Sequence, residues 1–592
     1  MCGIVGYIGR RSAQPILIEC LKRLEYRGYD SWGIGILGTE IQVIKDKGMI
    51  SNLGELPKVE GGIGIGHTRW ATHGRPSKEN AHPHTDCKSE IAVVHNGVIT
   101  NFQTLREKLS AEGHVFRSET DTEVIAHLIE KYYQGNLKEA LEKAIGELKG
   151  SYALAIIHKD FEGIAVACCQ SPLVIGLGDR EFFLASDTPA FLDYTNREIR
   201  LRDGDIGIIS KEGLKIFNQG VEVKREEEKF IWGIEEARKG GYEHFMLKEI
   251  HDQPKALSSM IGEYLFPIES EVNLGFRGKR DFNNILFLGC GTSYYAALIG
   301  KQVTERLARM PARAEIASEF NYSDPVLEKT WAIAITQSGE TFDTKEALKR
   351  AKEHGAYTLA IVNRVGSTIS YIADETFYTR AGLELCVAAT KSFTCQLLAL
   401  YLLALFLSQD EMEKRRLIAG LHELPGKVSL VLEKEEELAE LGAFLADYDE
   451  LFLVSRGINL PIASEGALKF KEIAYIHAED YPAGELKHGP FALLTPHTPV
   501  IAIIGKDETY EALLSNIKEM KAREAPVVAL SYEGDNESDK YVDSLIKLPE
   551  INPLLSPVVN VVALQLLAYY AAKKRGCPID KPRNLAKSVT VE

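Results

Sequence analysis

The chain has 592 residues, of which 45% are hydrophobic and 26% are charged, the composition of a folded globular protein. It carries 69 Lys and Arg against 84 Asp and Glu, a formal net charge of −15. These values exclude a disordered chain, a collagen and a disulfide-stapled miniprotein. They also argue against general nucleic-acid or anionic-membrane binding, because phosphate surfaces repel an acidic protein.

The nine cysteines are odd in number, scattered, and never spaced Cys-x-x-Cys. We therefore expect neither a disulfide framework nor a structural zinc site, and we predict no metal and no cofactor. The N-terminal residues MCGIVGYIGR lack the basic and apolar regions of a signal peptide, so the expected location is the cytoplasm.

Residues 1–220 contain short apolar runs that read as strands, with helical patterns at 13–25 and 120–133, and predict an α+β domain. The highly charged residues 221–242 are expected to be a linker. Residues 243–425 and 426–580 alternate helices with fully apolar strands, which is typical of parallel sheets covered by helices. Residues 581–592 follow as a non-periodic tail.

The two α/β segments resemble each other. The strand patterns ILFLG, WAIAIT and TLAIVN recur in order as LFLVS, VIAII and VVALS, each about 165 residues later, as in a duplicated domain. Two apolar stretches, 392–409 and 551–572, are long enough to suggest membrane spans. The second holds Asn, Gln and Pro residues and the first has a short apolar centre, so we expect buried core helices and no membrane.

Cys2 directly follows the initiator Met1. Removal of Met1 is expected before a small residue, and it would place the thiol beside a free α-amine with a pKa of about 7.7–8.0, a nucleophile with its own base. Taken alone, Cys2 could equally be a small apolar residue that opens a strand.

The surrounding motifs favour the nucleophile. CGIVGYIG, LEYRGYDSWGIG, HTRWATHG, NAHPH, HNGVITN and SETDTE occur in this order and resemble the N-terminal-nucleophile glutamine amidotransferases. The resemblance implies an αββα glutaminase domain with Cys2 as nucleophile and Asn96 and the Gly97 N–H as oxyanion hole. It further implies glutamine-binding roles for Arg69, on the substrate carboxylate, for Asp121, on its ammonium, and for Trp70, Thr72 and His82.

Five histidines of these motifs, His67, His73, His82, His84 and His95, could suggest a metal. Their spacing matches no standard ligand pattern, and the resemblance accounts for them without one, so no metal is predicted here.

In the first α/β half, GCGTSYYAA (289–297) and TQSGETFDT (336–344) each join an apolar strand to a helix. Such turns direct N–H groups and hydroxyls at an anion, although Ser and Thr are also ordinary helix caps. The sequences of these two turns resemble those of the phosphosugar-isomerase domain family. That resemblance implies sugar-phosphate contacts by Thr292, Ser293, Thr336, Gln337, Ser338, Thr341, Val387, Glu465 and Lys469.

The resemblance extends through EGALKFKEIAYIHAEDYPAGELKHGP (465–490) and the tail KPRNLAKSVTVE. It implies that Lys587 forms a Schiff base with a ketose, Glu472 transfers a proton and His488 opens the sugar ring. Without it, Glu465, Lys469 and Glu472, at spacings of four and three, would read as a solvated salt-bridge ladder. Ala389 stands where the family often has Ser, which puts a side-chain contact to the sugar there in doubt.

Together these resemblances imply an enzyme that hydrolyses glutamine, transfers the ammonia to fructose 6-phosphate and isomerises the product to glucosamine 6-phosphate. A homodimer is implied by the resemblance alone. Three alternatives stay open: an amidophosphoribosyltransferase-type enzyme, which would need a phosphoribosyl-pyrophosphate motif; a non-catalytic phosphosugar sensor; and an enzyme for another ketose phosphate or for deamination.

Overall fold

The computed structural model describes residues 2–229, 238–266, 271–276 and 282–590. Its contacts divide the chain into two compact units. The first comprises Met1–Ala237 together with Ala586–Glu592, and the second comprises Arg238–Leu585. The predicted tail is thus divided, because its last seven residues group with the first unit.

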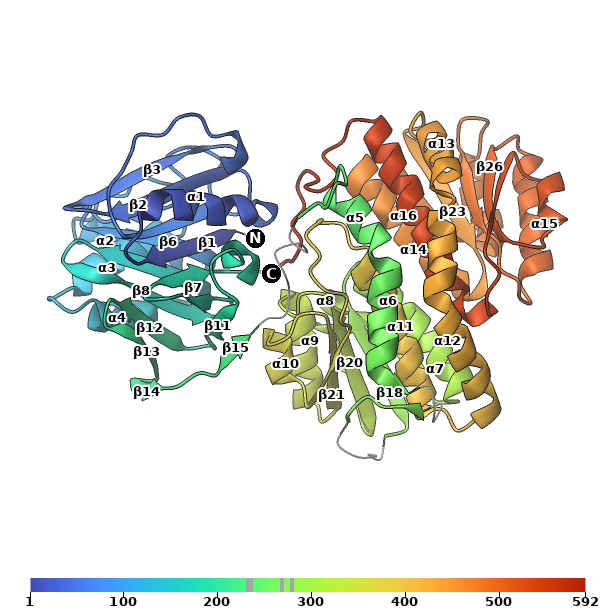
Figure 1. The fold of residues 1–592 in the computed structure, drawn as a ribbon, viewed down its shortest axis with the longest axis horizontal. Coiled ribbons are helices and arrows are strands. Elements are labelled where there is room, and N and C mark those ends of the chain that lie inside the picture. Colours follow the sequence, from blue (N-terminus) through green and yellow to red (C-terminus); the bar gives the residue numbers. More distant parts are fainter. Residues whose placement is uncertain (1, 230–237, 267–270, 277–281, 591–592) are drawn as a thin grey trace. The chain divides into compact units, whose positions relative to one another are not determined.

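The first unit contains two antiparallel sheets, seen in blue to green in Figure 1. The eight-stranded sheet has the order β15-β11-β9-β10-β1-β4-β2-β3. In chain order its strands are β1 (Gly3–Ile8), β2 (Ser31–Leu37), β3 (Ile41–Lys47), β4 (Ile63–Arg69), β9 (Val174–Leu177), β10 (Phe182–Ala185), β11 (Arg197–Arg200) and β15 (Glu227–Lys229).

The seven-stranded sheet has the order β14-β13-β12-β8-β7-β6-β5. Its strands are β5 (His84–Thr85), β6 (Ile91–Ile99), β7 (Gly150–His158), β8 (Phe161–Cys169), β12 (Asp205–Ser210), β13 (Gly213–Asn218) and β14 (Val221–Val223). The predicted linker therefore begins with two short edge strands, β14 and β15, while residues 230–237 lie outside the described part of the chain.

Side chains from the inner faces of both sheets form one buried cluster, which includes Ile4, Ile65, Val94 and Ala155. Helix α1 (Ala13–Arg23) packs on β1 and β4 of the eight-stranded sheet. Helices α2 (Phe102–Ala111), α3 (Glu123–Tyr132) and α4 (Leu137–Glu147) cover the other sheet and share its second cluster. This is the predicted αββα arrangement, and the two predicted helical patterns correspond to α1 and α3.

The second unit holds two five-stranded parallel sheets with matching strand orders, β19-β18-β20-β21-β22 and β24-β23-β25-β26-β27. The first sheet comprises β18 (Asn284–Gly289), β19 (Ala312–Ile316), β20 (Thr330–Thr336), β21 (Tyr357–Val362) and β22 (Glu375–Tyr378). The second comprises β23 (Glu450–Ser455), β24 (His477–Pro482), β25 (Val500–Ile503), β26 (Val527–Tyr532) and β27 (Ser544–Leu548). The three predicted strand echoes are β18 with β23, β20 with β25 and β21 with β26, so the predicted duplication is confirmed.

Helices of both halves interlock in one apolar core of the second unit. Its longer helices are α6 (Gln253–Tyr264), α7 (Thr292–Leu307), α9 (Phe342–Glu353), α11 (Lys391–Leu407), α12 (Glu411–Leu432), α13 (Glu435–Leu445), α14 (Leu460–Lys469), α15 (Tyr510–Lys521) and α16 (Ser556–Lys574). The shorter ones are α5 (Phe245–His251), α8 (Ala317–Phe320) and α10 (Thr368–Ile372), and a short β-hairpin pairs β16 (Leu265–Phe266) with β17 (Glu271–Val272).

The two apolar stretches form α11 and α16, which are buried along most of their length. One segment of the described chain, Pro553–Lys574, is apolar and long enough to cross a membrane, and 89% of its most apolar window is buried within the fold. Packing inside the protein core therefore explains why the side chains of this helix are apolar.

Candidate active sites

Cys2 lies directly before β1, in a half-buried position. Its Sγ accepts a hydrogen bond of 3.3 Å from the backbone N–H of Trp70, just beyond the end of β4. Its carbonyl oxygen accepts bonds from Asn96 Nδ2 (2.9 Å) and Arg27 Nε (3.3 Å). Three elements thus hold the first residue of the strand. Met1, whose removal we expect, lies outside the described residues.

The orientation of the Asn96 amide follows from His67. His67 Nε2 lies 3.0 Å from the His95 carbonyl oxygen, which can only accept, so this nitrogen carries the proton. The same nitrogen lies 3.1 Å from Asn96 Oδ1. Burial lowers the pKa of His67 to about 3, and the ring is neutral. The amide NH₂ of Asn96 therefore faces Cys2, the orientation that an oxyanion-hole donor needs.

Gly97 and Asp121 are held close to the same strand. Gly97, on β6, has φ of +127°, and a side chain there would come within 2.1 Å of the Ser151 carbonyl oxygen, so only glycine fits. Asp121 is buried and accepts a 2.9 Å bond from the Ile99 N–H at the end of β6. Gly97 therefore lies near the end of β6, and Asp121 lies in the turn before α3.

Arg69 is buried at the end of β4, where its Nη2 donates to the carbonyl oxygens of His73 and Gly74. Its Nη1 has no hydrogen-bond partner in the described part of the chain. A guanidinium with one committed and one uncommitted nitrogen can still bind a carboxylate. Of the other predicted glutamine-binding residues, Trp70 is half-buried and Thr72 is exposed.

His82 belongs to a buried histidine network. Its ring stacks on His67 at a centroid separation of 4.0 Å and meets His84 edge-on at 4.7 Å. Burial holds the pKa of His82 and of His84 well below the usual value, so both rings are neutral. These rings act as hydrogen-bonding and packing groups: His82 Nδ1, for example, accepts the His95 N–H at 3.3 Å.

In the second unit, the two predicted phosphate turns leave adjacent parallel strands, β18 and β20, at their carboxyl ends. The chain order reverses between these strands, which is where open α/β sheets bind ligands. A Cβ on Gly289 would lie 2.8 Å from the Ser293 backbone, so the tight turn into α7 requires glycine. Ser293 Oγ accepts a 3.1 Å bond from Gln396 Nε2 of α11.

The second turn is tied by its own hydroxyls. Thr336 Oγ1 accepts the Gly339 N–H at 3.2 Å and lies 3.4 Å from Thr341 Oγ1, and Ser338 Oγ accepts the Glu340 N–H at 3.1 Å. The neighbouring Gln337 carbonyl oxygen accepts the Asn363 N–H at 3.2 Å. These contacts shape a hydroxyl-rich loop at the start of α9.

Glu465, Lys469 and Glu472 form a buried charged cluster rather than a solvated ladder. Glu465 and Lys469, on α14, are both 0% exposed, and Lys469 Nζ lies 3.3 Å from Glu465 Oε1. Lys469 also pairs with Glu472, which follows in the π-helical segment Phe470–Ala474. Thr292, in the first phosphate turn, donates to Glu465 Oε1 at 3.2 Å. The two halves of the duplication therefore build this cluster together.

Two groups of the cluster, Glu465 and Lys469, have pKa values shifted from their ordinary values. Burial raises the pKa of Glu465 to about 7; the nearby Lys469 lowers it and Glu472 raises it further. Burial opposes the charge on Lys469, but the two carboxylates outweigh it and raise the pKa of that amine. A carboxyl group that titrates near neutrality, as Glu465 does, can exchange a proton with a neighbouring group, while the Lys469 ammonium stays charged.

Three further predicted residues lie outside α14 and the π-helical segment. His488 is exposed at the end of the 3₁₀ segment Ala483–His488, and no hydrogen bond or ion pair within the described residues joins it to the cluster. Val387 donates its N–H to the Asp580 carbonyl oxygen at 3.2 Å. Lys587 belongs to the segment that groups with the first unit, and its place relative to Glu472 stays a prediction.

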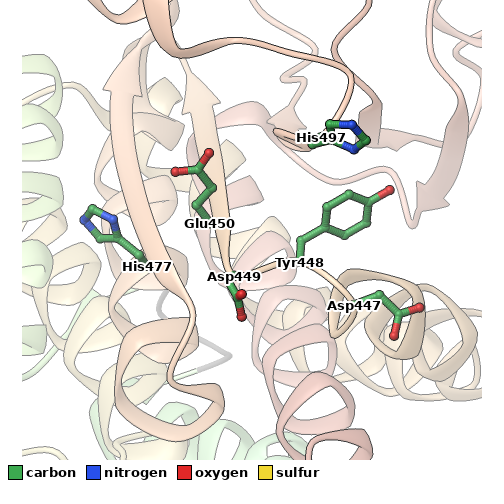
Figure 2. A pocket seen from close by; sticks show the side chains of 6 residues that line it. All are labelled: Asp447, Tyr448, Asp449, Glu450, His477 and His497. Carbon is green, nitrogen blue, oxygen red and sulfur yellow. The ribbon is translucent and has the colours of Figure 1, made fainter.

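A surface pocket of about 510 Å³ lies elsewhere, at the amino ends of β23 and β24 (Figure 2). The residues that line it are Asp447, Tyr448, Asp449, Glu450, His477 and His497. It occupies the edge of the sheet opposite to the carboxyl ends, and it contains none of the predicted site residues.

Comparisons with known proteins bear on both units. A glutamine amidotransferase domain model matches residues 67–193, and a SIS domain model matches residues 280–406 and 444–575. Glutamine–fructose-6-phosphate aminotransferase (isomerising) from Thermus thermophilus is 47% identical over 604 residues, and the enzyme of the same name from Methanosarcina acetivorans is 49% identical over 618 residues. Both alignments cover 100% of this chain and of the relative.

The chain belongs to the glutamine–fructose-6-phosphate aminotransferase (isomerising) family. The solved C-terminal domain of the glucosamine–fructose-6-phosphate aminotransferase from Francisella tularensis is 35% identical, with a TM-score of 0.55, and covers 58% of this chain and 99% of that chain. The expected fold class, a glutamine amidotransferase domain followed by two SIS domains with parallel sheets, is confirmed.

Two residues without a role predicted from the sequence hold Cys2 and the turn after Trp70. Arg27 lies in LEYRGYDSWGIG and forms a buried ion pair of 2.8 Å with Asp187 while it donates to Cys2. Asp30, in the same motif, accepts the Ala71 N–H at 2.8 Å and so ties the turn after Trp70. The motif was noted, but only the fold reveals that Arg27 reaches Cys2 and that Asp30 reaches the turn after Trp70.

Proposed function

We propose that this chain hydrolyses glutamine at Cys2, transfers the ammonia to fructose 6-phosphate and isomerises the product to glucosamine 6-phosphate. The observation that carries the proposal is full-length membership of the family, combined with a Cys2 whose thiol and carbonyl are held by Trp70 and Asn96. The alternative of a phosphoribosyltransferase finds no support in a chain with two SIS domains.

The glutaminase half-reaction uses the first unit. The Cys2 thiol gives its proton to the α-amine freed by removal of Met1, and the sulfur adds to the glutamine amide carbon. Asn96 Nδ2 and the Gly97 N–H hold the oxyanion, while Arg69 and Asp121 hold the α-carboxylate and α-ammonium. The C–N bond breaks, ammonia leaves, and water hydrolyses the thioester to glutamate.

The amination uses the second unit. His488 opens the sugar ring, the hydroxyl-rich turns with Ser293 and Ser338 bind the phosphate, and Lys587 forms a Schiff base with the C2 ketone. Ammonia replaces the lysine, and Glu472 moves a proton from C1 to C2 to give the amino aldose. The buried ammonium of Lys469 pairs with the Glu472 carboxylate and holds it in position for this transfer.

Ammonia must pass between the two reactions without escaping to water, so we propose a shielded path gated at Trp70 and a glutaminase that is switched on by sugar binding. We also propose that the chain acts as a homodimer in the cytoplasm. Equal glutaminase rates with and without fructose 6-phosphate would contradict the coupling.

The deciding experiment measures glucosamine 6-phosphate formed from glutamine and fructose 6-phosphate by the full chain, with free ammonia as a control donor. Lys587→Arg should retain glutamine hydrolysis, form no amino sugar and lose the borohydride-trapped sugar adduct. A phosphosugar sensor would form no product with either donor. An enzyme for another ketose phosphate would prefer that sugar over fructose 6-phosphate in direct competition.

A further inference from the structure

Four potential metal ligands meet on the first unit at a place that the glutaminase chemistry does not use. Cys87 lies in the connection between β5 and β6, His114 follows α2, and His127 and Glu130 lie one turn apart on α3. One donor atom from each of these four side chains lies within 4.8 Å of every other.

Four of the six distances between these donor atoms are known, and three of them lie within about 0.3 Å of the edges of a zinc tetrahedron, while the distance from Glu130 to His114 is that of a hydrogen bond. Cys87 Sγ lies 3.8 Å from His114 Nδ1 and 3.6 Å from His127 Nδ1. Glu130 Oε2 lies 2.8 Å from His114 Nδ1 and 3.2 Å from His127 Nδ1. Zinc bonds of about 2.3 Å to sulfur and about 2.0 Å to nitrogen and oxygen, at tetrahedral angles, separate sulfur from nitrogen by about 3.5 Å and nitrogen from oxygen by about 3.3 Å.

The surroundings support a cation. The Glu123 carboxylate, which accepts hydrogen bonds from the Arg117 and Ser118 N–H groups, places a negative charge 3.9 Å from His127 Nε2, the ring atom that points away from the cluster. His127 is 0% exposed, and its Nε2 has no hydrogen-bond partner in the described part of the chain. A thiolate and a carboxylate with two neutral imidazoles also cancel the charge of a divalent ion, which suits a half-buried site.

We propose that Cys87, His114, His127 and Glu130 bind one zinc ion as a closed, structural tetrahedral site. Binding releases the thiol proton of Cys87 to water. Sulfur with imidazole ligands favours zinc over magnesium or calcium, and four protein ligands leave no open position for catalysis. The ion would cross-link the β5–β6 connection and the segment after α2 to α3, the helix that begins two residues after Asp121.

The proposed site shares no residue with the five histidines considered from the sequence, of which His67, His82 and His84 pack against one another. The four ligands escaped detection because Cys87 lies 27 residues before His114 and no pair has a familiar zinc spacing. Only the packing of α3 against the β5–β6 connection brings them together.

The test uses the full chain without a histidine tag, purified without chelator, reconstituted with equimolar zinc and gel-filtered before elemental analysis. We expect about one zinc per chain in the parent and near none in Cys87→Ser or in His127→Gln. Cys169→Ser, a matched half-buried cysteine of the same unit, and Cys2→Ala should keep the metal. A parent without stoichiometric zinc, or a Cys87→Ser protein that retains it, overturns the proposal.

Two further readouts cover variants that fold poorly. Cobalt substituted into the parent should give the intense visible bands of a tetrahedral site and a thiolate charge-transfer band, and the latter should be missing in Cys87→Ser. Glu123→Gln, which removes the negative charge beside His127 and also alters the acceptor of the Arg117 and Ser118 N–H groups, should bind zinc more weakly than the parent in chelator competition. Octahedral cobalt spectra, or unchanged affinity in Glu123→Gln together with no thiolate band in the parent, contradict the site.

Discussion

Thr292 donates a 3.2 Å hydrogen bond to Glu465 and thereby joins the first phosphate turn of one SIS domain to the charged helix of the other. The same hydroxyl lies 3.4 Å from Lys469 Nζ. A ligand at the first turn is therefore separated by a single residue, Thr292, from the cluster of Glu465, Lys469 and Glu472. In the proposed mechanism, phosphate binding and proton transfer therefore share this contact.

The pKa of Glu465 yields a prediction about stability. Because its folded pKa, about 7, exceeds the ordinary value of 4.5, the folded state binds the extra proton more tightly. Its contribution to stability is full below pH 4.5 and is lost as the pH rises through 7. Glu465→Gln, which mimics the protonated acid, should remove this dependence, so the parent should lose stability relative to the variant between these pH values in denaturant titrations.

Cys2→Ala should abolish glutamine hydrolysis while the fold and the ammonia-dependent synthesis of glucosamine 6-phosphate remain. The proposed mechanism assigns the attack on the amide to this thiol, and the substitution lies outside the second unit. Glutamate release and amino-sugar formation are measured separately. Persistent glutamate release from the variant would rule out Cys2 as the nucleophile.

Asn96→Ala should lower the kcat of glutamine hydrolysis by about 10²–10³-fold, the usual effect of losing one oxyanion donor. The KM for glutamine should change little, because Arg69 and Asp121 hold the substrate. The rate with free ammonia serves as the internal control. A selective rise in KM would instead assign Asn96 to substrate binding.

Asp187→Ala should destabilise the first unit by about 3–5 kcal/mol, because it leaves the buried guanidinium of Arg27 without its partner. Glutaminase activity should fall as well, since Arg27 also holds the Cys2 carbonyl. Glu162→Ala, which breaks the exposed pair with Lys211, is the matched control and should cost less than about 1 kcal/mol. If the two variants lose the same amount of stability, the buried pair contributes no more to stability than the exposed pair does.

Gly339→Ala should raise the KM for fructose 6-phosphate about 10-fold or more. Its φ is +70°, and the new methyl group would lie 2.1 Å from Ser367 Oγ, so the turn that carries Ser338 must move. Gly355 has a similar φ of +85°, but a methyl group there would meet no atom within 4 Å. Gly355→Ala is therefore the control that carries the backbone strain without the clash. The two variants should therefore differ in KM while both fold.

The sequence was sufficient for the fold class and the duplication, because apolar strands and helical patterns report burial directly, whereas the roles of the candidate residues stay predictions. It could not reveal which distant residues meet. Arg27 reaches Cys2 through the pairing of the strands around it, and Thr292 reaches Glu465 across two domains. Glu465 and Lys469 also look exposed by composition, and only the fold buries their charges completely.

The π-helical segment Phe470–Ala474 makes the second unit unusually intolerant of a change in chain length. Such a wide turn arises where one extra residue is accommodated within an α-helix. Deleting a single residue there would restore ordinary winding and rotate the following side chains by about 100°, so the Glu472 carboxylate would leave Lys469. We therefore expect this segment to tolerate substitutions more readily than insertions or deletions.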